Sequence, residues 1–160
     1  MNKAKVKSQK AKVWRGQHCY LLTFALCLAL MSSAGCSYLF YPRAGDYLAQ
    51  AKGQTGVETL LNLTSLLETS VNATRGTNYQ TGLDDLHNQM HALNDAFCGV
   101  TEQQGKTPTY AKAVTLKKEM WTVFMRIWKN RDDQAVREAH VDLFGKRIQE
   151  LRETLQTLKG

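Results

Sequence analysis

One stretch of the chain carries five side chains of types that bind metal ions, at regular intervals. They follow one another at steps of three or four residues and are Asp84, His87, His91, Asp95 and Cys98. On a helix such steps place residues on one face, and two histidines four positions apart can chelate a divalent ion. The pattern makes His87, His91 and Cys98 candidate metal ligands. It fits a solvated polar face equally well, and we favour that interpretation because no further ligand is identifiable elsewhere.

A fourth histidine suggests a different chemistry. His140 lies between Val136 and Leu143, so we expect it to point into the core of its helix packing. Four-helix cytochromes hold haem between a histidine and a methionine on different helices, and Met90 or Met120 could supply the second ligand here. The sequence has no Cys-x-x-Cys-His motif for covalent haem. A core histidine hydrogen-bonded to a neighbour explains the position more simply.

A second apolar stripe follows the third predicted helix and makes a candidate partner-binding surface. Its residues are Val114, Trp121, Met125 and Trp128. At 100° per residue it lies roughly 100° from the centre of that helix's core stripe. Either the second or fourth helix covers it, or it is an exposed patch that receives a partner. Core packing is the simpler interpretation of the two.

Enzymatic activity finds no support in the sequence. There is no glycine-rich phosphate loop, no nucleophile elbow, no His-Glu-x-x-His motif and no cysteine with an evident base. The adjacent carboxylates Asp84 and Asp85, and Asp132 and Asp133, lie at predicted helix starts, where they stabilise the helix dipole. We therefore expect a binding protein with neither a catalytic site nor an obligatory cofactor.

The elements that position these residues are predicted to be helices throughout. Apolar residues recur at helical spacing over residues 45–72, 83–103, 110–129 and 132–158, and no segment alternates as a strand does. The second segment has a heptad seam, and its members are Leu83, Leu86, Met90, Leu93, Phe97 and Val100. Short connections favour antiparallel neighbours, so residues 45–160 are predicted to form an all-α, single antiparallel four-helix bundle.

The positive charge of the chain is concentrated at its start. Six of the 21 lysines and arginines lie within the first 15 residues, and no acidic residue precedes Asp46. Without that leader, 15 basic residues face 14 acidic ones, so the rest of the chain is nearly neutral. A nucleic-acid partner is therefore not expected.

The basic leader is followed by an apolar run and then by small residues that end at a cysteine. This order is typical of a secretory signal. The sequence Ser33-Ala34-Gly35-Cys36 resembles the lipobox of bacterial lipoprotein precursors, although those usually have leucine where this chain has Ser33. The resemblance implies that residues 1–35 are a signal peptide and that Cys36 becomes the acylated first residue, followed by a tether over 36–44. Several acyl chains, such as palmitate, would anchor the protein stably in a membrane.

Two other interpretations of the leader stay open. Residues 20–41 are long enough to form an uncleaved membrane anchor, and an ordinary cleaved signal would release the protein. For a lipoprotein, Ser37 after the cysteine implies the outer rather than the inner membrane. The sequence thus predicts an envelope protein whose domain faces the periplasm. Its expected function is accessory or scaffold contact with a protein partner, and the alternative is a periplasmic metal- or haem-binding bundle.

Overall fold

The computed structural model describes residues 41–159, and this part of the chain is all-α. The prediction of an all-α fold is thereby confirmed. The helices are α3 (Ala44–Gln50), α4 (Gly56–Ala73), α5 (Tyr79–Ala96), α6 (Glu102–Gly105), α7 (Pro108–Lys129) and α8 (Gln134–Lys159), with a 3-10 turn, η1 (Phe97–Gly99), after α5.

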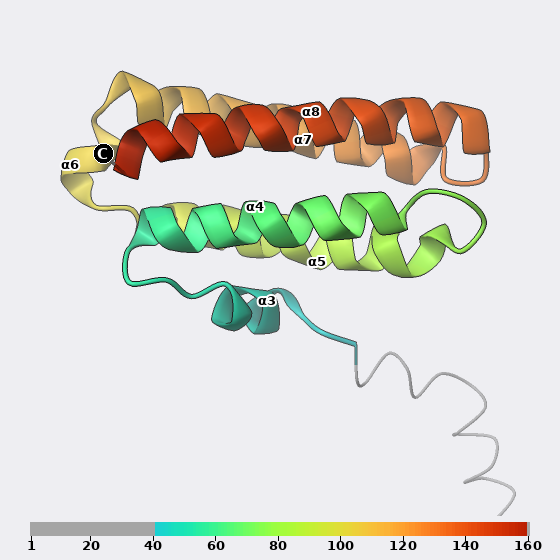
Figure 1. Ribbon diagram of the computed structural model, residues 1–160, viewed down its shortest axis with the longest axis horizontal. Helices are drawn as coiled ribbons and strands as arrows, with labels where there is room; N and C mark the ends of the chain where they lie inside the picture. The colour runs from blue at the N-terminus through green and yellow to red at the C-terminus, as the bar shows by residue number, and fades with distance from the viewer. Residues whose placement is uncertain (1–40, 160) are drawn as a thin grey trace, which may run out of the picture. The chain divides into compact units, whose positions relative to one another are not determined.

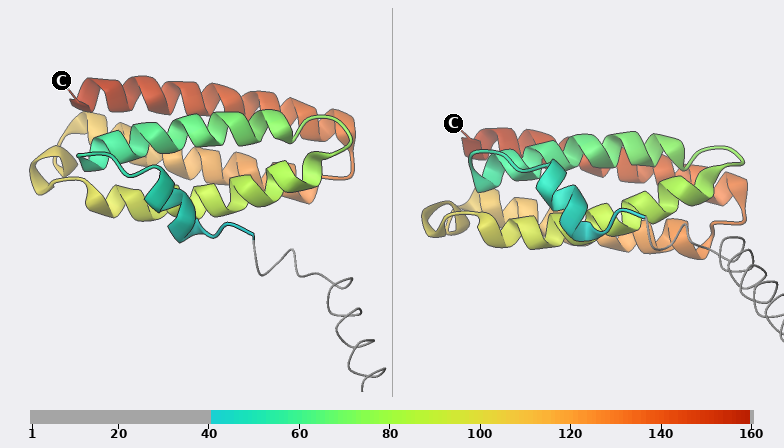
Figure 2. Two further views of the ribbon diagram at one scale, coloured as in Figure 1. Left: turned by 60° about the horizontal axis from the view of Figure 1, so that its bottom comes forward. Right: turned by 90° about the horizontal axis from the view of Figure 1, so that it is seen from below.

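Four long helices lie side by side in two layers, one made of α4 and α5 and the other of α7 and α8 (Figure 1). Each long helix runs antiparallel to the next one in the chain. Contacts are extensive between α4 and α5, α7 and α8, and α4 and α8, whereas α5 and α7 approach each other less closely. The short helix α3 lies across the outside of α4 and α5 (Figure 2).

The core follows the predicted apolar stripes closely on three helices. All six predicted core residues of α7 are buried: Ala113, Leu116, Met120, Val123, Phe124 and Ile127. Every residue of the heptad seam is buried except Val100, which is half-buried. On α4, Leu61 is half-buried and Leu63 takes its place in the core.

On α8 the predicted stripe is partly wrong. Val136 is 38% exposed and Ala139 is exposed as well, whereas Arg137 and Val141 are buried. The physical reason is the helical register. At 100° per residue Arg137 and Val141 continue the face of Phe144, whereas Val136 and Ala139 lie roughly 100° or more from the centre of that face. Hydrogen bonds to carbonyl oxygens satisfy the inward Arg137 side chain. From Phe144 onward the stripe is as predicted, with Ile148, Leu151 and Leu155 buried and Leu143 and Leu158 half-buried.

Side chains at the helix starts fix where the long helices begin. Thr107 accepts a hydrogen bond from the backbone N–H of Tyr110 at 3.1 Å, and Pro108 occupies the first turn of α7. Asp133, just before α8, accepts from the N–H of Val136 at 3.1 Å. Both caps satisfy backbone donors that have no partner within the helix.

The first predicted helix, 45–72, is in fact two helices, α3 and α4. Thr55 accepts from the N–H of Glu58 at 3.1 Å, and the Glu58 carboxylate accepts from the N–H of Gln54 at 2.9 Å. The Thr55 cap starts a new helix at Gly56. A side chain at Gly56 would lie 2.2 Å from the carbonyl oxygen of Gly99, so the start of α4 can pack against the end of η1 only because residue 56 is glycine.

The second predicted helix, 83–103, is displaced toward the N-terminus. The structure starts α5 at Tyr79 and ends it at Ala96, and α6 occupies part of the predicted 104–109 loop. Gly82, which precedes the predicted start of this helix, lies inside it. A Cβ atom there would be 2.7 Å from the backbone of Ala73 and Thr74, so Gly82 permits close packing between the start of α5 and the end of α4.

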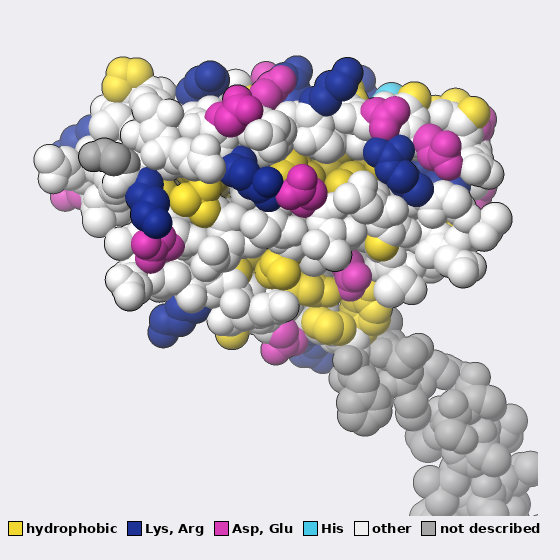
Figure 3. All heavy atoms as spheres, viewed as in Figure 1, with side chains coloured by type: hydrophobic (Ala, Val, Ile, Leu, Met, Phe, Trp, Pro, Cys, Tyr) yellow, Lys and Arg dark blue, Asp and Glu magenta, His cyan; other side chains and the backbone are white. Residues whose placement is uncertain are grey.

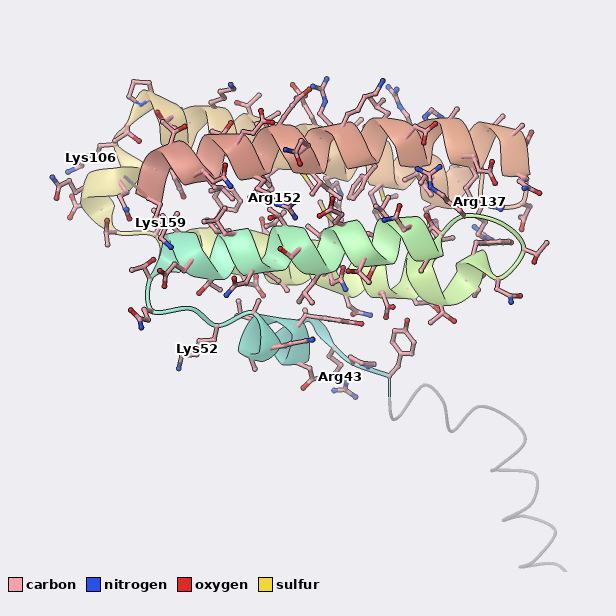
Figure 4. All side chains as sticks on the ribbon, in the orientation of Figure 1. Arg43, Lys52, Lys106, Arg137, Arg152 and Lys159 are labelled. Atoms are coloured by element: carbon pink, nitrogen blue, oxygen red, sulfur yellow. The ribbon has the colours of Figure 1, made fainter. Side chains whose placement is uncertain are left out.

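Arg137 joins the two turns at one end of the long helices (Figure 4). Its guanidinium donates to the carbonyl oxygens of Thr74 at 3.2 Å and Gly76 at 2.6 Å, and to that of Arg131. It also lies over the ring of Tyr79, 4.0 Å from the centroid. A buried arginine is thus stabilised by carbonyl oxygens and an aromatic face, which holds the turn between α4 and α5 against the start of α8.

The α4 and α8 face carries charges of both signs (Figure 3). Arg152 pairs with Glu68 at 2.7 Å, and Lys159 pairs with Glu58 at 3.1 Å. Among the helices of residues 41–159, none is long and apolar enough to cross a membrane.

Candidate interaction site between α5 and α7

Aromatic side chains fill the line along which α5 and α7 meet, and we call this line the aromatic seam. It consists of His87 and His91 from α5 and of Trp121, Phe124 and Trp128 from α7. The His87 ring stacks on Phe124, with centroids 5.9 Å apart and planes 11° from parallel, and it lies 5.6 Å from Trp128. The His91 ring meets Trp121 edge-on at 5.1 Å. These large rings bridge the wider separation of the two helices.

The seam joins two predictions that were made separately from the sequence. The histidines came from the metal stripe and the tryptophans from the second apolar stripe. The spacing within each helix shows that its candidate residues share a face, because steps of four on α5 and of seven on α7 keep residues on one side. Pairing the faces required knowing which helices are neighbours.

The second apolar stripe is covered only in part. Val114, Trp121 and Trp128 are half-buried and pack against the core cluster. Met125, one turn from each tryptophan, is 48% exposed. The stripe is therefore partly covered and partly exposed. The histidines of α5 cover its inner edge, and its outer edge reaches solvent.

A groove of about 410 Å³ opens beside the seam. Its lining residues are Met90, His91, Asn94, Lys117, Lys118 and Trp121. Met90 is buried and Trp121 half-buried, so the groove has apolar walls. Lys117 donates to the Asn94 side-chain oxygen at 2.8 Å and lies 5.0 Å from the centroid of the Phe97 ring. Asn94, Lys117 and Lys118 were not candidates from the sequence, although two lysines just before Trp121 could have drawn attention to a basic rim.

The two histidines of α5 contact each other directly. Their Nε2 atoms lie 3.2 Å apart, within hydrogen-bonding distance, so one ring nitrogen donates and the other accepts. Burial lowers the pKa of His87, and the neighbouring His91 lowers it further, while the Asp84 carboxylate acts in the opposite direction. Burial also raises the pKa of Asp84, assisted by the charge of Asp85. The lowered pKa favours the neutral form of His87, which is the form that binds a metal ion.

Cys98 does not join the histidines. It lies in η1 with an exposed free thiol, and Asp95 is exposed as well. Within residues 41–159, no three His, Cys, Asp or Glu side chains are close enough together to hold a metal ion. The predicted stripe lies on the flank of α5, and it offers a pair of histidines rather than a three-ligand site.

His140 is half-buried on α8, while its neighbour Val141 takes the core position. Met90 and Met120 are both buried in the core. The expected inward direction of His140 is therefore only partly met, because its position in the helical register lies beside the core face of α8. Haem binding through His140 stays a prediction.

The predicted lipidation site, Cys36, lies outside the described residues. In comparisons with protein families, curated proteins and solved structures, nothing matches the chain. We therefore infer the function from the geometry and charge of the α5 and α7 face.

Proposed function

We propose that this protein is a membrane-tethered accessory module that docks a protein partner on the α5 and α7 face. The tether is the acylated Cys36 after a cleaved signal, and the location is the bacterial envelope, facing the periplasm from the outer membrane. The docking domain is an antiparallel four-helix bundle formed by α4, α5, α7 and α8. Its role is binding and assembly, not catalysis.

The observation that carries this proposal is the half-exposed aromatic stripe of α7. Two half-buried tryptophans and the exposed Met125 lie on one side of α7, and Trp121 also lines the open groove. Tryptophan is over-represented among residues that dominate binding energy, since it buries a large area with few rotatable bonds. Methionine adapts its shape to a partner surface.

Charge indicates what kind of partner fits. Two lysines, Lys117 and Lys118, line the groove beside Trp121, and no acidic residue is among its lining residues in the described part of the chain. The single carboxylate of α7, Glu119, is paired with Arg147 of α8 at 3.1 Å. The groove is therefore apolar with a positive edge. An amphipathic helix whose apolar side is flanked by Asp and Glu is complementary to it, in the helix-in-groove mode of recognition.

The test compares two charge substitutions at exposed apolar positions. Met125→Glu places a carboxylate on the proposed docking face, and Val136→Glu places one at a similarly exposed position on α8. Each protein is extracted gently from its own membranes, and the proteins that accompany it are quantified by mass spectrometry. We expect one stoichiometric partner that is lost with Met125→Glu and retained with Val136→Glu. Equal retention with both variants would contradict the proposed face.

A further inference from the structure

The contact between His87 and His91 has the dimensions of a metal chelate. A tetrahedral Zn²⁺ ion with Zn–N bonds of 2.0–2.1 Å holds two nitrogen ligands about 3.3 Å apart. The two Nε2 atoms are 3.2 Å apart without an ion. We propose that His87 and His91 form a two-histidine site for a divalent metal ion, with Zn²⁺ as the ion that the geometry fits.

Both rings are held in place by neighbours other than the metal. His87 is stacked on Phe124, and His91 lies against the edge of Trp121. Both residues lie within α5, away from its ends, so the helix backbone fixes their separation. Ion binding therefore requires a small rotation of the rings and little ordering, which reduces its entropic cost.

The pair combines a sheltered ligand with an accessible one. His87 is half-buried among aromatic rings, whereas His91 is exposed, so an ion can enter from solvent. The Asp84 carboxylate, one turn before His87, is close enough to shift the pKa of that histidine and also favours a cation there. One lysine of the groove wall, Lys117, donates a hydrogen bond to Asn94.

The described residues supply two protein ligands and no third. Water fills the two remaining positions of a tetrahedral shell, one more than at an open zinc site with three protein ligands, so the site binds ions reversibly. This inference does not depend on the docking function, because binding of the ion is measured without any partner.

The experiment is isothermal titration calorimetry of the full chain in detergent with ZnCl₂. The matched set is the parent, His91→Ala, His140→Ala and Cys98→Ser. We expect one Zn²⁺ per chain with the parent and at least about tenfold weaker binding with His91→Ala, equivalent to ~1.4 kcal/mol. The His140 and Cys98 variants should match the parent. His91 is exposed, so its alanine variant should retain the helical circular dichroism of the parent.

A second measurement reports where the ion binds. Cu²⁺ binds imidazole more tightly than Zn²⁺ and quenches the fluorescence of nearby tryptophans. In a Trp14→Phe background, only Trp121 and Trp128 emit. Saturable quenching that His91→Ala removes would support the site. The proposed site would be overturned by equal Zn²⁺ binding to the parent and His91→Ala, or by no binding to the parent. A loss of Zn²⁺ binding with Cys98→Ser would overturn it as well.

Discussion

Replacing Arg137 with methionine should destabilise the domain severely. Methionine keeps an unbranched apolar stem but removes the guanidinium that donates to the carbonyl oxygens of Thr74, Gly76 and Arg131. Hydrogen bonds from a charged donor contribute about 1.5–3 kcal/mol each, while burial of the charge offsets part of that sum. We expect a net loss of about 3–5 kcal/mol in the free energy of unfolding.

The assay is urea and thermal unfolding followed by circular dichroism. For a domain of this size, that loss lowers the midpoint temperature by about 12–20 °C. Arg137→Lys should recover little of the stability, because one ammonium group cannot reproduce the planar fork of donors. The matched control is Arg75→Met, whose ion pair with Asp142 is 2.7 Å long and exposed. It should cost less than about 1 kcal/mol. An Arg137→Met protein within 1 kcal/mol of the parent would refute the clamping role.

Three further predictions concern the α3 contact, helix packing and the tether. Tyr47 donates to the Asp85 carboxylate at 2.5 Å, and Tyr47→Phe should cost about 1–2 kcal/mol at neutral pH. Burial, followed by this hydrogen bond, raises the pKa of Tyr47, so the hydroxyl's contribution is complete below pH ~10 and declines above it. The difference from Tyr47→Phe in urea unfolding should therefore shrink in alkali, and a constant difference would contradict this assignment. Gly82→Ala should destabilise by about 1–3 kcal/mol, whereas Gly145→Ala, where a Cβ meets nothing within 4 Å, should stabilise by about 0.5–1 kcal/mol in the same assay. Cys36→Ala should abolish labelling by radioactive palmitate, and unchanged labelling would exclude acylation at that residue.

Periodicity was sufficient to predict the helices and most of the core, because the apolar stripes of α5 and α7 are long and regular. The break between α3 and α4 was missed even though Thr55 and Glu58 have capping-box spacing. The early start of α5 was missed because a glycine inside a helix resembles a turn residue until its close neighbours are known.

Long-range contacts explain the other differences from the sequence predictions. The inward position of Arg137 depends on carbonyl oxygens 61 and 63 residues away, which no local pattern reveals. The aromatic seam likewise required the pairing of α5 with α7, since each helix alone shows only its own stripe. The candidate residues were therefore identified individually, and their combination was not.

Site-specific photo-crosslinking tests whether a partner docks on the α5 and α7 face. A benzophenone amino acid is placed at Met125 in one protein and at Gln156, an exposed position of α8, in another. Both proteins are irradiated in their native membranes. We expect one discrete adduct from position 125 that is lost with Lys118→Glu, and none from position 156. No adduct from position 125, or the same adduct from both positions, would contradict it.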